Sequence, residues 1–180
     1  MYLGGVETPP KFGSELPGPK GPGFGSLDET GLSGDTMTFL EKQEKLKALF
    51  RDCPDASART AKLIDLGRAQ PPLPPENKTP ANRVHGCQST MYLTTRLEEG
   101  LVYFAGEADA LVSNGLAALL ILVYSGEMPE TILKCPPTYL EEIGLRSSLS
   151  LNRLNGLESI LLRMKQEALK MVIGHGLRHG

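Results

Sequence analysis

The chain has 180 residues, of which 40% are hydrophobic and 22% are charged, a composition that suits one globular domain with some extra length. Its formal net charge of −2 and its lack of tryptophan give no electrostatic or base-stacking argument for a nucleic-acid partner. The longest apolar run, residues 116–124, is too short for a membrane-spanning helix, which needs about 20 residues. The first residues also lack the basic segment and apolar core of a signal peptide. We therefore expect neither a nucleic-acid nor a membrane partner.

The three cysteines, Cys53, Cys87 and Cys135, are far apart, and no pair has the CxxC spacing. An odd number of cysteines in a chain with enough apolar residues for a core argues against a disulfide scaffold. We therefore expect a reducing intracellular compartment and a cytoplasmic location.

Three regions are predicted along the chain. Residues 1–36 are expected to form a disordered tail, because glycine and proline recur throughout and apolar residues are too sparse to offset the entropy of ordering. Residues 37–172 are expected to form the folded domain. Residues 173–180 are expected to be a flexible C-terminal tail.

Two helices are predicted at the start of the domain. A Thr-x-x-Glu capping box at Thr38 predicts the start of the first helix, and the Cys53-Pro54 dipeptide ends it. A second helix is predicted over residues 55–68, with the aspartate at its first position as the N-cap. The proline-rich stretch that follows, residues 70–80, is predicted to be extended and polyproline-like.

Apolar and polar residues then alternate with a period of two, which is typical of half-buried strands. Short strands are predicted at residues 83–85, 90–97 and 101–105. The Gly86-Cys87 and Glu99-Gly100 dipeptides are expected to form the turns between them. Three strands joined in this way form an antiparallel meander.

Helices are predicted to cover one face of this meander. Asp109 is expected to cap the first of them, which Gly126 ends. Pro129 opens a short helix, a capping box at Thr138 begins another, and the last helix begins near Ser150. Segregated strands and helices predict an α+β fold, with a small three-stranded antiparallel sheet packed against helices.

Cys87 is the leading candidate for a chemically active residue. One interpretation is that it is a small buried hydrophobic residue, as free cysteines often are. Its neighbours favour a reactive thiol: Gly86 allows positive φ, and Gln88 and Ser89 offer hydrogen-bond donors to a thiolate or a bound sulfur. His85 would lie on the same side as Cys87 on a regular strand, where an imidazolium would lower the pKa of the thiol.

Two other chemistries are open to these residues. Cys87 and His85 could bind zinc with Cys53, Cys135 or an aspartate, but no close pair of cysteine ligands supports such a site. A Cys/His hydrolase needs a base, an orienting group and an oxyanion hole. The other two histidines lie within residues 173–180, which leaves His85 alone for this chemistry. We therefore expect no bound metal and no such dyad.

Several short motifs are spread over residues 38–170. They are Ile64-Asp65-Leu66-Gly67, Pro71-Pro72-Leu73-Pro74, Lys78-Thr79-Pro80-x-Asn82-x-Val84-x-Gly86-Cys87-Gln88-Ser89, Gly106-Glu107-Ala108-Asp109, Gly115-Leu116 and Asn152-Arg153-x-Asn155-Gly156-Leu157. Together they resemble the SufE family of sulfur-acceptor proteins, and the Gly-Cys-Gln-Ser core in this context is the most specific part.

The resemblance implies a sulfur carrier with a SufE/IscU-like fold. A SufE-like protein stimulates a PLP-dependent cysteine desulfurase, accepts the sulfane sulfur that this enzyme takes from L-cysteine, and delivers it to an iron–sulfur scaffold complex. Cys87 would then become the persulfide, and PLP belongs to the desulfurase, so no cofactor is expected in this chain. We expect the Cys87 loop to be shielded in the free protein and to swing out when the desulfurase binds.

The remaining expectations concern supporting residues and the alternative function. Arg153 is expected either to contact the Cys87 loop or the partner, or to be a solvated helix residue. Asp109 is expected to act as a helix cap. The alternative is a non-catalytic metal-binding or scaffold module of iron–sulfur assembly, although the cysteine trio of IscU-type proteins is not seen. The sequence leaves the oligomeric state, monomer or homodimer, open.

Overall fold

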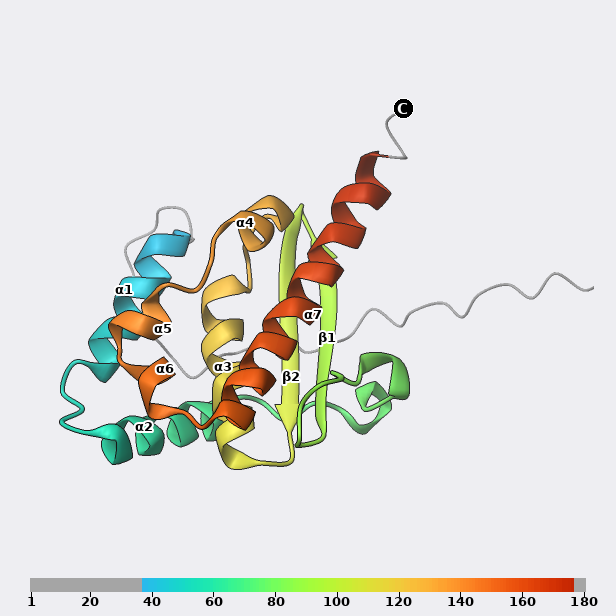
Figure 1. Ribbon diagram of the computed structural model, residues 1–180. Helices are drawn as coiled ribbons and strands as arrows, with labels where there is room; N and C mark the ends of the chain where they lie inside the picture. Colours follow the sequence, from blue (N-terminus) through green and yellow to red (C-terminus); the bar gives the residue numbers. More distant parts are fainter. Residues whose placement is uncertain (1–36, 177–180) are drawn as a thin grey trace, which may run out of the picture.

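The computed structural model describes residues 37–176 as an α+β domain, which confirms the predicted fold class (Figure 1). The predicted N-terminal tail, residues 1–36, lies outside the described residues, as do residues 177–180 of the predicted C-terminal tail. Residues 173–176, which were predicted to belong to the C-terminal tail, continue the last helix. The elements in chain order are α1 (Phe39–Phe50), α2 (Ala56–Ala69), η1 (Pro75–Asn77), η2 (Pro80–Asn82), β1 (Met91–Glu98), β2 (Leu101–Ala108), α3 (Leu111–Tyr124), α4 (Pro129–Lys134), α5 (Tyr139–Glu142), α6 (Leu145–Ser148) and α7 (Leu151–Gly176). Within the described range, no helix is long and apolar enough to cross a membrane.

Among the described residues the sheet has two strands, so the prediction of three was wrong. β1 and β2 pair antiparallel along their full lengths. The predicted first strand contributes one isolated bridge, between Arg83 and Tyr92, next to a 2.8 Å hydrogen bond from the Val84 N–H to the Met91 carbonyl. Pairing does not continue because Gly86 has a φ of 91°, which turns the backbone away from the extended conformation.

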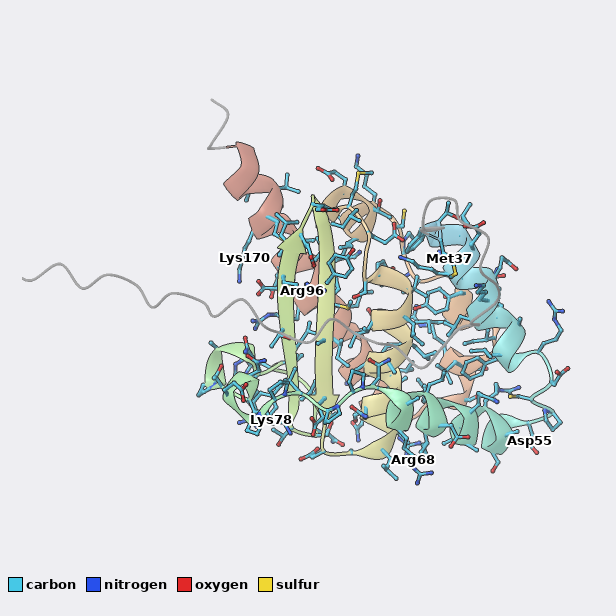
Figure 2. The ribbon with its side chains drawn as sticks, turned by 180° about the vertical axis from the view of Figure 1, so that it is seen from behind. Met37, Asp55, Arg68, Lys78, Arg96 and Lys170 are labelled. Atoms are coloured by element: carbon cyan, nitrogen blue, oxygen red, sulfur yellow. The ribbon has the colours of Figure 1, made fainter. Side chains whose placement is uncertain are left out.

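The β1–β2 hairpin has one buried face and one open face. Met91, Leu93, Val102 and Phe104 alternate along the strands and are at most 2% exposed, because they face α3 and α7. The opposite face carries polar side chains such as Arg96 and is not covered by helices (Figure 2). The period-two pattern of the sequence thus placed Met91 and Leu93 correctly in the core, whereas Leu97, further along the same predicted face, is exposed.

α2 and α3 cross in close contact. A methyl group at Gly115 would lie 2.3 Å from the Leu63 carbonyl oxygen, and one at Gly67 would lie 2.7 Å from the Gly115 backbone nitrogen. Glycine at both positions therefore lets the two backbones touch. Asn114 fixes the crossing, because its side-chain amide donates to the Gly67 carbonyl at 2.8 Å and its Oδ1 accepts from the Ala108 N–H at 3.0 Å.

The predicted helix starts have mixed outcomes. The capping box at Thr38 is confirmed, and Asp55 Oδ1 accepts from the Ala58 N–H as expected of an N-cap. The capping box predicted at Thr138 is wrong, because a turn already begins at Pro136 and leaves Thr138 in a helical conformation. An N-cap needs an extended backbone to aim its side chain at the first turn.

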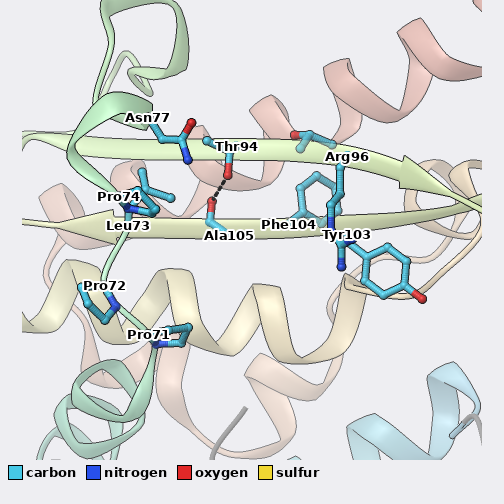
Figure 3. A pocket seen from close by; sticks show the side chains of 11 residues that line it. Pro71, Pro72, Leu73, Pro74, Asn77, Thr94, Arg96, Tyr103, Phe104 and Ala105 are labelled. Carbon is cyan, nitrogen blue, oxygen red and sulfur yellow. Dashed lines mark hydrogen bonds between the residues drawn. The ribbon is translucent and has the colours of Figure 1, made fainter. Parts of the chain in front are cut away.

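The proline-rich stretch is extended only at its start, because η1 and η2 form two single 3₁₀ turns further along. Glu107 of β2 anchors the stretch: its carboxylate accepts from the Leu73 N–H and from Lys78 Nζ, each at 2.7 Å. A groove of about 90 Å³ separates the first prolines from the open face of the hairpin, near Arg96 and Tyr103 (Figure 3). It contains no cysteine, histidine or carboxylate.

α7 packs across the domain and brings its first turns to the end of the molecule where β2 ends and α3 begins (Figure 1). Leu157, Leu161, Met164 and Ala168 are buried along it, which confirms the stripe that predicted this helix. The loop before β1 reaches the same end, so residues from three distant parts of the chain meet there.

Candidate functional site

Cys87 lies in the short loop between Arg83, which forms a bridge with Tyr92, and the start of β1 at Met91. The loop packs against α7. Gly86 allows this approach for two reasons. Its φ of 91° is unfavourable for residues with a side chain, and a methyl group there would lie 2.5 Å from Ser159 Oγ. The sequence prediction that Gly86 turns the backbone at positive φ is therefore confirmed.

The Cys87 thiol is half-buried and faces the helix. Its S–H donates to the Gly156 carbonyl, with 3.6 Å between sulfur and oxygen. Burial raises the pKa of the Cys87 thiol, because a thiolate loses hydration in this position. The thiolate is the reactive form of cysteine, so the resting arrangement protects the thiol from reaction.

A cavity of about 630 Å³ opens beside the sulfur. Its apolar wall includes Ile64 of α2, Leu116 of α3 and Ile160 of α7. Its polar wall includes Gln88, Ser89, Asn152, Arg153 and Asp109. The Ser89 hydroxyl oxygen is buried and has no hydrogen-bond partner in the described structure.

Asp109 holds the other end of the loop rather than capping α3, so the predicted cap was wrong. Its Oδ1 accepts from the Thr90 N–H, and the N-cap of α3 is Ala110, which makes no side-chain cap. The hairpin register explains this role: β1 and β2 pair Met91 with Ala108, so Thr90 and Asp109 are the next residues opposite each other. The predicted two-residue turn at Glu99-Gly100 sets this register, so extending the pairing from that turn could have identified Asp109.

The cavity brings together Cys87, Gln88, Ser89 and Arg153 of the predicted site. His85 is exposed and does not line it. The loop is not a regular strand, so the two-residue spacing does not place the imidazole beside the thiol. The prediction that His85 tunes the thiol therefore has no support in the geometry.

The residues proposed as zinc ligands are separated in the fold. Cys53 follows α1 and lines a different hollow from Cys87, and Cys135 follows α4. Among the side chains that the structure describes, no group of three or more His, Cys, Asp or Glu residues is placed to hold a metal ion. Cys87 is the one cysteine among the described residues that line its cavity.

Residues 44–168 match the family described as "SufE: Fe-S metabolism associated domain". The chain is 35% identical over 136 residues to an uncharacterized SufE-like protein of Synechocystis sp., which covers 76% of this chain and 86% of that protein. It is 36% identical over 135 residues to an uncharacterized SufE-like protein of Rhizobium etli, which covers 72% of this chain and 91% of that protein.

Two further relatives extend the comparison. The cysteine desulfuration protein SufE of Plasmodium falciparum is 29% identical over 158 residues, which is 84% of this chain and 61% of that protein. The solution structure of a hypothetical protein from Thermus thermophilus superposes with a TM-score of 0.61 at 30% identity, over 73% of this chain and 96% of that one. The sequence is therefore similar to both proteins, and the fold is similar to that of the Thermus thermophilus protein.

Proposed function

The chain belongs to the SufE family, and we propose on this basis that it carries sulfur from a PLP-dependent cysteine desulfurase to iron–sulfur assembly, with Cys87 as the acceptor. The observation that carries this proposal is the position of the Cys87 sulfur on a glycine-turned loop, beside a cavity and hydrogen-bonded to α7. A carrier needs a thiol that is protected at rest and can still be presented to another protein.

The transfer step is a thiol exchange. The Cys87 thiolate attacks the outer sulfur of the persulfide on the desulfurase cysteine, and a new bond forms between Cys87 Sγ and that sulfur. The old sulfur–sulfur bond breaks, and the desulfurase cysteine leaves as a thiolate. The Cys87 proton goes to solvent or to a base of the partner, so no oxidant or reductant is needed.

The resting geometry supports a loop that moves. In the free protein the thiol has a raised pKa and a long hydrogen bond to Gly156, so it reacts slowly. We propose that binding of the desulfurase draws the loop away from α7, which returns the thiol to water and restores its ordinary acidity. The same movement is the means by which the carrier stimulates its partner.

The other predicted residues have supporting roles in this proposal. Gln88 and Ser89 supply hydrogen-bond donors next to the sulfur, and exposed Arg153 presents a cation at the cavity mouth. Exposed His85 lies outside the cavity, where it is placed to contact the partner protein. The sulfur recipient is an iron–sulfur scaffold complex.

Mass spectrometry tests the proposal directly. The protein is mixed with a cysteine desulfurase and L-cysteine, and the expected result is a gain of one sulfur atom on the peptide that contains Cys87. Cys53→Ser and Cys135→Ser variants are matched controls and should load normally. Absence of loading together with absence of stimulated sulfide release would rule out the carrier function. Normal stimulation by Cys87→Ser would rule out the acceptor assignment.

A further inference from the structure

The cavity beside Cys87 is larger than storage of one sulfur atom requires. Its volume of about 630 Å³ lies within the range of roughly 300–1,000 Å³ that is typical of small-molecule sites. Its apolar wall includes Ile64 of α2 and Leu116 of α3, and its polar wall includes Asn152 and Arg153 at the start of α7. Such a cavity can hold an organic molecule next to the sulfur.

Two helix starts make this cavity favourable for a negative group. The first turn of α3, residues 111–113, lines it, and α3 has no side-chain cap, so its first N–H groups lack intrahelical partners. The first turn of α7 lines it through Asn152 and Arg153. Helix starts carry partial positive charge, and the Arg153 guanidinium adds a full positive charge at the cavity mouth.

The remaining polar groups of the cavity limit which kind of ligand could carry this negative group. Asp109 is exposed at the rim of the same cavity, which disfavours a dianion and suits a ligand that also has an ammonium group. These groups match the carboxylate and ammonium groups of an amino acid.

From this arrangement we infer that the cavity binds a small thiol with a carboxylate and an ammonium group, such as a thiol-bearing amino acid, as an acceptor of the Cys87 sulfur. The inference rests on the proposed carrier function. The carboxylate binds Arg153 and the helix starts, which directs the ligand thiol to the persulfide. The ligand thiolate attacks the outer sulfur, a new sulfur–sulfur bond forms on the ligand, and Cys87 leaves as a thiolate. The products are a small-molecule persulfide and the unloaded protein.

The experiment compares L-cysteine with cysteamine, which lacks only the carboxylate. The full chain is loaded on Cys87 with inorganic polysulfide, freed of excess reagent, and checked by mass. Loss of the added sulfur is then followed against thiol concentration, and each rate is divided by the rate of the same thiol with a small-molecule persulfide. We expect saturation with L-cysteine and a preference of about tenfold over cysteamine, the size that one charge-assisted hydrogen bond supplies.

Variants identify the residues responsible. Arg153→Ala should lose most of the preference for L-cysteine, and Arg68→Ala should keep it, because Arg68 lies on α2 outside the cavity and pairs with Asp65. Equal normalised rates for the two thiols, or a mixed disulfide on Cys87 with release of sulfide, would overturn the inference. Because polysulfide loads the thiol without a desulfurase, failure of enzymatic loading would count against the proposed function alone.

Discussion

Thr90 and Asp109 hold each other through two hydrogen bonds. The Thr90 N–H donates to Asp109 Oδ1 at 3.0 Å, and the Asp109 N–H donates to the Thr90 carbonyl at 3.1 Å. Next to Asp109, the Ala108 N–H donates to Asn114 Oδ1 at 3.0 Å. The end of the Cys87 loop is therefore connected through β2 to the first turns of α3.

Asp109→Ala should loosen this loop, because the Thr90 N–H loses its acceptor. We expect several-fold faster alkylation of Cys87 by iodoacetamide and a loss of about 1 kcal/mol in the free energy of unfolding. Asp109→Asn is the matched control, since it keeps an acceptor oxygen and should alkylate at a rate close to that of the unchanged protein. Equal rates for all three proteins would show that Asp109 does not restrain the loop.

Gly86→Ala should move the loop away from α7, because the added methyl group meets Ser159 Oγ at 2.5 Å and the φ of 91° is strained for alanine. Gly100→Ala separates the two effects, since Gly100 has a φ of 81° but no atom within 4 Å of the added methyl. We expect both to lower the melting temperature and only Gly86→Ala to speed alkylation of Cys87. Adding Ser159→Ala to Gly86→Ala should reverse part of that increase.

The pH dependence of Cys87 alkylation should report its burial. Burial raises the pKa of this thiol, so the folded protein keeps the proton to higher pH than the unfolded chain does. The rate of alkylation, which follows the thiolate, should therefore rise at higher pH in the folded protein than in the protein unfolded by urea. Peptide mapping separates Cys87 from Cys53 and Cys135. Superimposed curves would contradict the buried position of the thiol.

Glu107→Gln should weaken the attachment of the proline-rich stretch to β2. The Lys78 ammonium and the Leu73 N–H lower the pKa of Glu107, so its contribution to stability is present above the ordinary glutamate pKa and is lost as pH falls through the lowered value. We expect a cost of about 1 kcal/mol at neutral pH that disappears in acid, measured by urea unfolding. Glu76→Gln, on exposed η1, should show no such pH-dependent difference.

Gly115→Ala should be among the most destabilising changes in the helices. The added methyl would lie 2.3 Å from the Leu63 carbonyl oxygen, so α2 and α3 must separate, at a cost of about 3 kcal/mol. Gly174→Ala makes the same change in α7 with no atom within 4 Å and should slightly stabilise the helix. Similar unfolding midpoints for the two variants would disprove the close crossing.

Features of the fold that depend on local periodicity could be predicted from the sequence. Features that depend on contacts between distant segments could not. The burial of Met91 and Leu93, the Thr38 cap and the α7 stripe follow from spacing alone. The third strand failed because the left-handed turn at Gly86 ends pairing after one bridge, and Asp109 was assigned to a cap because its partner is 19 positions away along the chain.

The site shows the same division. Cys87 was identified from its neighbours and from the family resemblance, and the cavity adds the positions of Gln88, Ser89 and Arg153. No periodic pattern could show that the starts of α3 and α7 converge beside the sulfur, because this depends on how two helices pack around the hairpin. The exposure of His85 likewise follows from the turn at Gly86.

The two backbone anchors of the loop set the reach of the sulfur. Val84 is bonded to Met91 on one side of Cys87, and Thr90 to Asp109 on the other. Each anchor is three residues from the cysteine, and an extended chain spans at most about 3.5 Å per residue. With both anchors intact, the Cys87 backbone can move to about 10 Å from either one. The loop thus lets the sulfur move only a short distance from the domain. A donor or acceptor must therefore bring its own reactive atom almost to the surface of this domain.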